Sequence, residues 1–244
     1  MRKFAALLIL SVLLIPAFAQ ETSTTTTTKK RTGRPDIPGT FVLEVGVNRA
    51  SGAPSNFKTG FWGSRTLNVY YQYEMRILKS NFSFVPGVGF SFERFKFTNK
   101  YTLDYSGSTL IMVSPAQAGR DGTKKSQLIT NYFEVPVEIC FRSNPDDPAR
   151  SFKASVGGRV GYLFDSFTKI KYTENGETKK LKDKQDFNLT KFRYGAYLKV
   201  GVGNFSVFGY YNLTNLFKNG KGPTQDSQVK DFNTVTVGIS LASF

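Results

Sequence analysis

Histidine is absent from the sequence, and cysteine occurs once, at Cys140. The missing imidazole excludes Ser-His-Asp and Cys-His catalytic arrangements and metal sites that contain histidine. A single cysteine excludes a small secreted module held by disulfides, and we interpret Cys140 as a buried, inert thiol. The paired carboxylates Glu134 and Glu138 are the nearest approach to an acid–base site. We therefore expect no catalytic residue, no cofactor and no metal.

Long hydrophobic runs are missing too, except at the N-terminus. Residues 1–3 carry two positive charges and precede an apolar stretch, 4–18, that closes with the small-x-small sequence AFA. This pattern predicts a cleaved signal peptide over residues 1–19. The alternative is a retained membrane helix, although the run is short for a span of about 20 residues. Residues 20–38, QETSTTTTTKKRTGRPDIP, have almost no apolar side chain and are predicted to be a disordered periplasmic linker.

Acidic residues are the minority among the charged ones, with 18 Asp and Glu against 33 Lys and Arg, so the formal charge is +15. Such a surplus suits partners that carry phosphate, either nucleic acid or a lipid surface. Because the export signal removes the protein from the cytoplasm, we expect lipid and no nucleic acid.

From residue 39 onward the hydrophobic period is two, with no helical stretch. In NYFEVPVEICFR, apolar side chains take every second position from Phe133 to Phe141, and Glu134 and Glu138 fall between them. Eight such rows predict eight strands. They lie in segments 41–47, 67–77, 82–92, 133–141, 152–164, 192–202, 205–213 and 235–241.

Long and short connections alternate along the chain, which predicts antiparallel neighbours. The long, polar connections are 49–65, 98–126, 169–187 and 218–230, and the short ones are 78–81, 143–150 and 203–204. All long loops should therefore lie at one end of the sheet, with both termini at the other end.

Volume decides which face is buried. The interior of an eight-stranded barrel is just filled by side chains, whereas the apolar rows together hold far more bulky residues than such a lumen admits. The polar rows carry the small residues, among them Gly46, Gly89, Gly161 and Gly195. The apolar face should point outward to lipid. The prediction for residues 39–244 is an all-β, eight-stranded antiparallel up-and-down transmembrane β-barrel.

Two sets of charged residues follow from this arrangement. A charge network inside the lumen is predicted from Glu134, Glu138, Arg142, Lys153, Arg159, Arg193 and Lys199. The segment KIKYTENGETKKLKDKQ at 169–185 is predicted to lie against the anionic outer leaflet or to hold an acidic partner, unless it is merely a solvated, mobile loop. Its lysines are Lys169, Lys171, Lys179, Lys180, Lys182 and Lys184, with Lys124, Lys125, Lys218 and Lys221 on neighbouring loops.

The segments YFEVPVEICF, GRVGYLFDSFTKIKY and GNFSVFGYYNLTNLFKNGKGP resemble the PorT-like outer-membrane β-barrel family of Gram-negative bacteria, and the resemblance covers residues 39–244. It implies a small outer-membrane barrel and, for some relatives, an accessory role in secretion. Two features depart from the pattern. The apolar row before Phe244 is one residue out of phase, and Pro86 and Pro136 interrupt strands that have no free edge. We expect bulges or strand ends at both prolines, and a further bulge at Glu93-Arg94, where the apolar parity changes.

The leading interpretation is a non-enzymatic outer-membrane barrel that displays surface loops as an anchor, an adhesin or an assembly or secretion accessory. A soluble, lipocalin-like lipid-binding barrel and a narrow porin are the alternatives. The expected partners are outer-membrane lipid and lipopolysaccharide, the barrel-insertion machinery and a possible protein at the extracellular loops.

Overall fold

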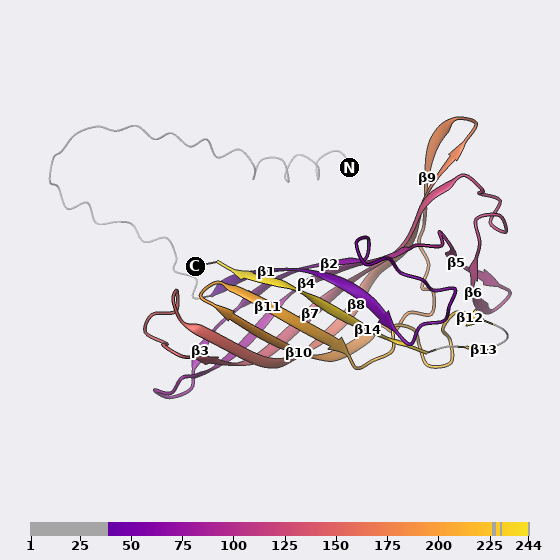
Figure 1. Ribbon diagram of the computed structural model, residues 1–244. Helices are drawn as coiled ribbons and strands as arrows, with labels where there is room; N and C mark the ends of the chain where they lie inside the picture. The colour runs from indigo at the N-terminus through magenta and orange to yellow at the C-terminus, as the bar shows by residue number, and fades with distance from the viewer. Residues whose placement is uncertain (1–38, 226–227, 230, 244) are drawn as a thin grey trace, which may run out of the picture. The chain divides into compact units, whose positions relative to one another are not determined.

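The computed structural model describes residues 39–225, 228–229 and 231–243, and nearly all of its regular structure is β-strand. Eight strands form the barrel: β1 (Thr40–Ser51), β2 (Arg65–Gln72), β4 (Phe82–Phe97), β7 (Thr123–Arg142), β8 (Phe152–Glu174), β10 (Phe192–Val202), β11 (Phe205–Asn212) and β14 (Asn233–Ala242). Each pairs antiparallel with the next, and β14 pairs with β1 to close the ring (Figure 1). The predicted eight-stranded up-and-down barrel is confirmed. The predicted signal peptide (1–19), the predicted linker (20–38) and Phe244 lie outside the described residues.

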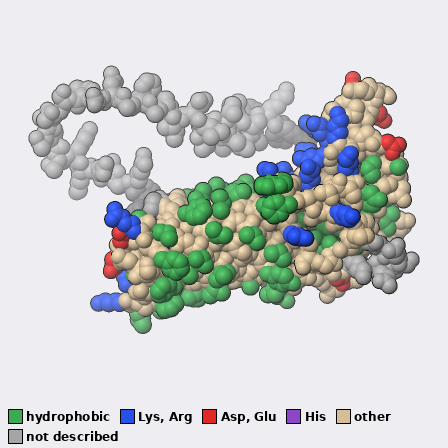
Figure 2. All heavy atoms as spheres, viewed as in Figure 1, with side chains coloured by type: hydrophobic (Ala, Val, Ile, Leu, Met, Phe, Trp, Pro, Cys, Tyr) green, Lys and Arg blue, Asp and Glu red, His purple; other side chains and the backbone are tan. Residues whose placement is uncertain are grey.

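Side chains along the barrel strands alternate between the outside and the lumen. On β4, Phe90 is 46% exposed whereas the next residue, Ser91, is 1% exposed. Figure 2 shows hydrophobic side chains spread over the outer wall of the barrel. Inside, a Cβ added to Gly161 would lie 3.2 Å from the Cγ atoms of both Glu134 and Arg193. Glycine at this position makes room for two charged side chains in a narrow lumen.

The alternation on β4 continues beyond Phe92, but the chemistry of the two faces is exchanged. Arg94 and Lys96 take the outward positions, while Phe95 and Phe97 point inward and are 0% and 1% exposed. The pairing of β4 with β7 runs without a register shift through this region. The predicted bulge at Glu93-Arg94 is therefore wrong. The change of parity in the sequence marks a level at which the barrel has polar side chains outside and apolar ones inside.

Above this level the long connections fold over the barrel and contribute to a hydrophobic core, here called the cap. The buried apolar side chains of the cap are Phe57, Phe95, Phe97, Leu103, Leu110, Met112, Leu128, Tyr132, Leu163, Phe187, Leu189, Leu216, Phe217 and Phe232. Short strands lie in the same region: β5 (Thr102–Ser106), β6 (Thr109–Val113), β12 (Thr224–Gln225) and β13 (Gln228–Val229). The long connections were predicted to be polar loops, and this is wrong at the positions that pack into the cap.

Segment 169–187, predicted to be a loop, is largely a β-hairpin. Strand β8 continues to Glu174, and β9 (Glu177–Asp183) folds back onto it. The turn residues Asn175 and Gly176 have φ values of 52° and 79°. A type I′ turn requires positive φ at both central residues, and Asn-Gly is its preferred sequence.

We expected a bulge or a strand end at each proline, but β4 and β7 continue through Pro86 and Pro136 without a register shift, so both alternatives are wrong for these two strands. Pro86 lies opposite Tyr73, whose N–H donates to the Pro86 carbonyl at 3.0 Å. Because proline has no N–H to return that bond, the ladder breaks between β2 and the two-residue β3 (Met75–Arg76). A bulge is present on β8, where Phe164 lies between two residues that pair with consecutive residues of β7. Odd-numbered residues of β8 face outward beyond it.

The first and last described residues meet at the end of the barrel that carries the short turns. Ser243 N–H donates to the carbonyl of Phe41 at 2.7 Å. Strand β14 pairs with β1 without a register shift up to Ala242. No helix in the described ranges has the length and apolarity of a membrane-crossing helix.

Candidate functional site

The Arg193 cluster occupies the lumen just below the cap. The guanidinium of Arg193 lies 2.9 Å from Glu93 Oε1 and 2.7 Å from Glu134 Oε1. Its Cζ lies 3.5 Å from the centre of the Tyr132 ring. The Tyr70 hydroxyl also donates a hydrogen bond to Glu134. One cation thus neutralises two buried carboxylates contributed by two different strands, β4 and β7.

The Lys199 cluster fills the lumen farther from the cap. Lys199 Nζ lies 2.9 Å from Glu44 Oε1 and 2.6 Å from Glu138 Oε1. Arg159 Nη2 lies 2.7 Å from Glu44 Oε2, and Gln72 donates to Glu138 at 2.5 Å. All four charged side chains are at most 7% exposed. Buried charges at this density are tolerated because each has a partner of opposite sign.

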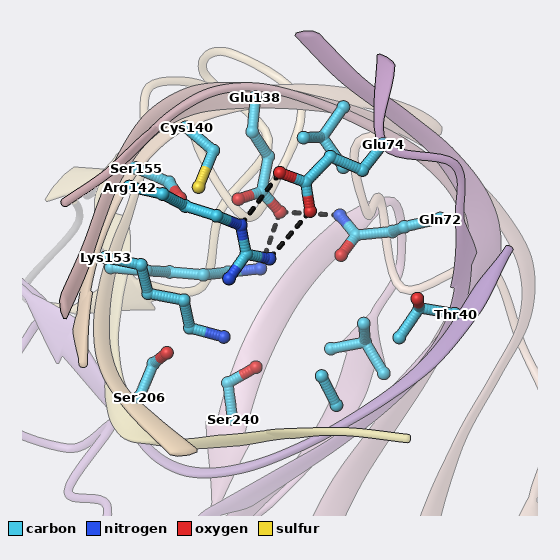
Figure 3. A pocket seen from close by; sticks show the side chains of 14 residues that line it. Thr40, Gln72, Glu74, Glu138, Cys140, Arg142, Lys153, Ser155, Ser206 and Ser240 are labelled. Atoms are coloured by element: carbon cyan, nitrogen blue, oxygen red, sulfur yellow. Dashed lines mark hydrogen bonds and ion pairs between the residues drawn. The ribbon is translucent and has the colours of Figure 1, made fainter. Parts of the chain in front are cut away.

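A small cavity of about 60 Å³ lies beyond Lys199, at the end of the barrel that carries the short turns. Figure 3 shows Glu74, Arg142 and Lys153 directed into it. Arg142 donates from Nε and Nη2 to the two carboxylate oxygens of Glu74, at 2.9 and 2.6 Å. Lys153 lines the cavity and makes no ion pair within the described part of the chain. A space of this size holds only a few water molecules.

All seven residues of the predicted lumen network lie either in the two buried clusters or at the small cavity. Five of them, Glu134, Glu138, Arg159, Arg193 and Lys199, lie in the two buried clusters. Arg142 forms an ion pair with Glu74 at the cavity near the short turns, and Lys153 lines the same cavity. Inward parity was the signal that identified these seven residues, and whether the network serves a function stays a hypothesis.

Three acidic partners were absent from the predicted network. Glu44 bridges Arg159 and Lys199, although its position between Leu43 and Val45 already marked it as inward-facing. Glu93 was missed because a bulge was expected there. Glu74 pairs with Arg142, and its place between Tyr73 and Met75, on the polar row of the predicted strand 67–77, had likewise marked it as inward-facing.

Neutral side chains add hydrogen bonds to the ion pairs of the lumen. Asn68 donates to Glu44, Tyr70 to Glu134 and Gln72 to Glu138. In the described ranges, no group of three or more His, Cys, Asp and Glu residues is placed to hold a metal ion.

The second charged region is a groove on the outer wall at the level of the exchanged faces, here called the basic groove. It encloses about 450 Å³ and is lined by Phe92, Arg94, Lys125, Gln127, Ile129, Asn131, Phe167, Lys169, Lys171 and Lys180. The strands that contribute are β4, β7, β8 and β9. Figure 2 shows basic side chains gathered at this end of the barrel, next to the hydrophobic wall.

The six predicted surface lysines divide among three environments. Lys169, Lys171 and Lys180 line the basic groove. Lys179 pairs with Glu174 and Lys184 with Asp165, each at 2.6 Å. Lys182 places its Nζ 3.7 Å from the centre of the Phe167 ring. Lys125, expected on a neighbouring loop, lies on β7 and lines the groove, and the structure adds Arg94.

Comparison with known proteins gives a family and a set of structural neighbours. A family model described as outer membrane protein beta-barrel domain matches residues 18–218. The chain is similar to the crystal structure of Ail, the attachment invasion locus protein of Yersinia pestis, at 15% identity and a TM-score of 0.31, covering 85% of this chain and 100% of that one. The backbone structure of the same Yersinia pestis protein in a phospholipid bilayer nanodisc gives 16% identity, a TM-score of 0.32, and coverage of 84% and 99%. No curated protein sequence matches.

Proposed function

The chain belongs to the family of outer membrane protein beta-barrel domains, and we propose that it is a closed, non-enzymatic barrel that anchors and displays a rigid head at the cell surface. The family places it in the outer membrane, where its outer wall contacts lipid. The head consists of the cap and of the β8–β9 hairpin. Anchoring, adhesion and assistance to secretion are all compatible with such a head.

The observation that carries this proposal is the change of chemistry along β4. Its outward positions are apolar over residues 82–92 and basic from Arg94 onward. The apolar length matches the about 9–11 residues of a tilted membrane strand. Strands β7 and β8, at 20 and 23 residues, extend well past that length. The parts of β7 and β8 that extend past the membrane-spanning length carry the hairpin and part of the cap beyond the membrane.

A second observation favours display over transport. The lumen is filled by the two ion-pair clusters and is covered at one end by the cap. Eight strands enclose no aqueous channel once side chains fill them, which speaks against a narrow porin. Buried charged side chains occupy the described lumen, which speaks against a soluble lipid carrier.

Orientation and processing complete the proposal. The cap faces the extracellular side and both termini face the periplasm, because long loops sit outside in barrels of this type. Residues 1–19 direct export, residues 20–38 tether the barrel, and the barrel-insertion machinery delivers it. Within the family we propose a PorT-like member, supported by the resemblance of YFEVPVEICF and its companion segments. Lipopolysaccharide and a protein bound at the head are the proposed surface partners.

An epitope inserted between Asn175 and Gly176 should be labelled by antibody on intact cells. The insertion enlarges an exposed hairpin turn outside the barrel ring, so folding should be retained. A matched epitope in the short turn 144–149 should be labelled only after the outer membrane is permeabilised. Both variants should remain in the membrane fraction after carbonate washing.

The reverse labelling pattern would contradict the orientation, and recovery without detergent would contradict the anchor. A steady ion current from the purified protein in a planar bilayer, with an open porin as the positive control, would show that the lumen conducts.

A further inference from the structure

The basic groove contains an unfavourable alignment of like charges. Lys171 of β8 is directly paired with Lys125 of β7 on one side and with Lys180 of β9 on the other. Lys169 is likewise paired with Lys182. Like charges directly opposite each other destabilise a sheet. No Asp or Glu is among the residues that line the groove. A bound anion is the species that would offset this repulsion.

The ionisation of Lys125, which lies beyond the apolar band of the wall, reflects the same crowding. Its pKa is below the ordinary lysine value because burial disfavours the charged amine and because Arg94 and Lys96 repel it. An anion in the groove would lower the electrostatic cost of holding Lys125 protonated.

Apolar side chains continue directly from the groove down the same outer wall. Phe92, Ile129 and Phe167 form part of its lining. Below them the Phe90 ring lies 5.7 Å from that of Phe133 and 6.0 Å from that of Phe164, with edge-to-face geometry. An anion with attached hydrocarbon would meet basic side chains first and aromatic ones next. A soluble anion would use only the basic half of this surface.

We propose that the basic groove binds the phosphate-bearing headgroup of an outer-leaflet lipid, with its acyl chains on the wall formed by Phe90, Phe133 and Phe164. The proposal rests on the proposed orientation, which puts the groove at the outer leaflet. Lysine amines and the Arg94 guanidinium donate hydrogen bonds to phosphate oxygens, and the guanidinium can do so through two N–H groups at once. Lys179 and Lys184 take no part because their own carboxylate partners neutralise them.

The test counts lipid molecules retained by the purified protein in native mass spectrometry. The probes are bisphosphorylated lipid A, the same lipid after enzymatic removal of its phosphates, and inorganic pyrophosphate as a competitor. Wild type should retain bisphosphorylated lipid A. The double variant Lys171→Gln/Lys180→Gln should bind it at least about tenfold more weakly, because two of the cations that would contact the headgroup phosphates are removed. The variant Arg94→Gln/Lys125→Gln, on two other strands, should show a similar loss.

The matched control is Lys179→Gln/Lys184→Gln, which removes the same charge from the same hairpin and should bind lipid A as wild type does. Each variant is first checked for the shift between unheated and boiled gel migration that a folded barrel shows. Equal binding by the groove and control variants, or equal retention of the dephosphorylated lipid, would overturn the proposal. Complete displacement by pyrophosphate would assign the groove to a free anion and overturn the lipid assignment. The epitope labelling of intact cells is independent of these outcomes, so failure of the lipid site and failure of the proposed function are distinguishable.

Discussion

Replacing Arg193 with methionine should lower the free energy of unfolding by about 3–5 kcal/mol. Methionine retains much of the side-chain length but none of the charge. Glu93 and Glu134, whose side chains are 4% and 0% exposed, would then face each other in the lumen without their cation. Breaking a buried pair costs more than the pair contributes, because the remaining charge cannot be hydrated. Urea titration of the barrel in lipid vesicles, followed by gel migration, measures the change.

The control for Arg193 is an exposed pair of similar geometry. Lys218 lies 2.8 Å from Asp186, with both side chains more than 40% exposed. Lys218→Met should cost no more than about 1 kcal/mol, because water screens the pair. Adding Glu93→Gln and Glu134→Gln to the Arg193 variant should recover part of the loss. Equal effects of Arg193→Met and Lys218→Met would show that the lumen is hydrated and open.

Replacing Phe57 with alanine should cost about 3–5 kcal/mol of cap stability. Phe57 is 2% exposed, and its ring lies 5.0 Å from that of Phe97 and 4.8 Å from that of Phe232. Its removal leaves a cavity among rings contributed by β4 and by the connection between β11 and β14. Because the membrane-facing part of the barrel is held separately by its closed hydrogen-bond ladder, the loss should be local. Hydrogen exchange and limited proteolysis should accelerate in the long connections while gel migration of the barrel stays unchanged.

The same substitution at Phe61, in the same connection, is the control. Phe61 is 62% exposed, so Phe61→Ala should change cap stability by less than about 0.5 kcal/mol. If the two variants show the same exchange rates, the cap is not a packed core.

The ring of eight strands was predictable because alternation and volume constrain it together. The row from Phe133 to Phe141 alternates strictly, and the lumen is too small to hold eight such rows, so the direction of the apolar face followed from counting. Register across the lumen was not predictable. Glu44 of β1 meets Arg159 of β8 on the opposite side of the ring, and that pairing depends on how far the strands are staggered, which a single sequence does not reveal.

Two of the errors in the sequence interpretation share one physical cause. A strand that leaves lipid exchanges its apolar and polar faces, and in sequence this looks the same as a bulge. The inward positions of Phe95 and Phe97 were interpreted as the result of a bulge at Glu93-Arg94. For the same reason Glu93 was left out of the predicted lumen network. The hairpin of β8 and β9 was read as a loop because its outward lysines hide the strand pattern. The Asn175-Gly176 pair was the available signal for a hairpin.

The outer wall of the barrel should meet lipid up to Phe92 and water beyond it. Nitroxide labels on single cysteines along β4, in a Cys140→Ser background and in lipid vesicles, test it through collision with oxygen and with a water-soluble nickel chelate. Labels at Val88, Phe90 and Phe92 should collide mainly with oxygen, and labels at Arg94 and Lys96 should collide mainly with the chelate. Ready access of the chelate to labels at 88–92 would contradict it.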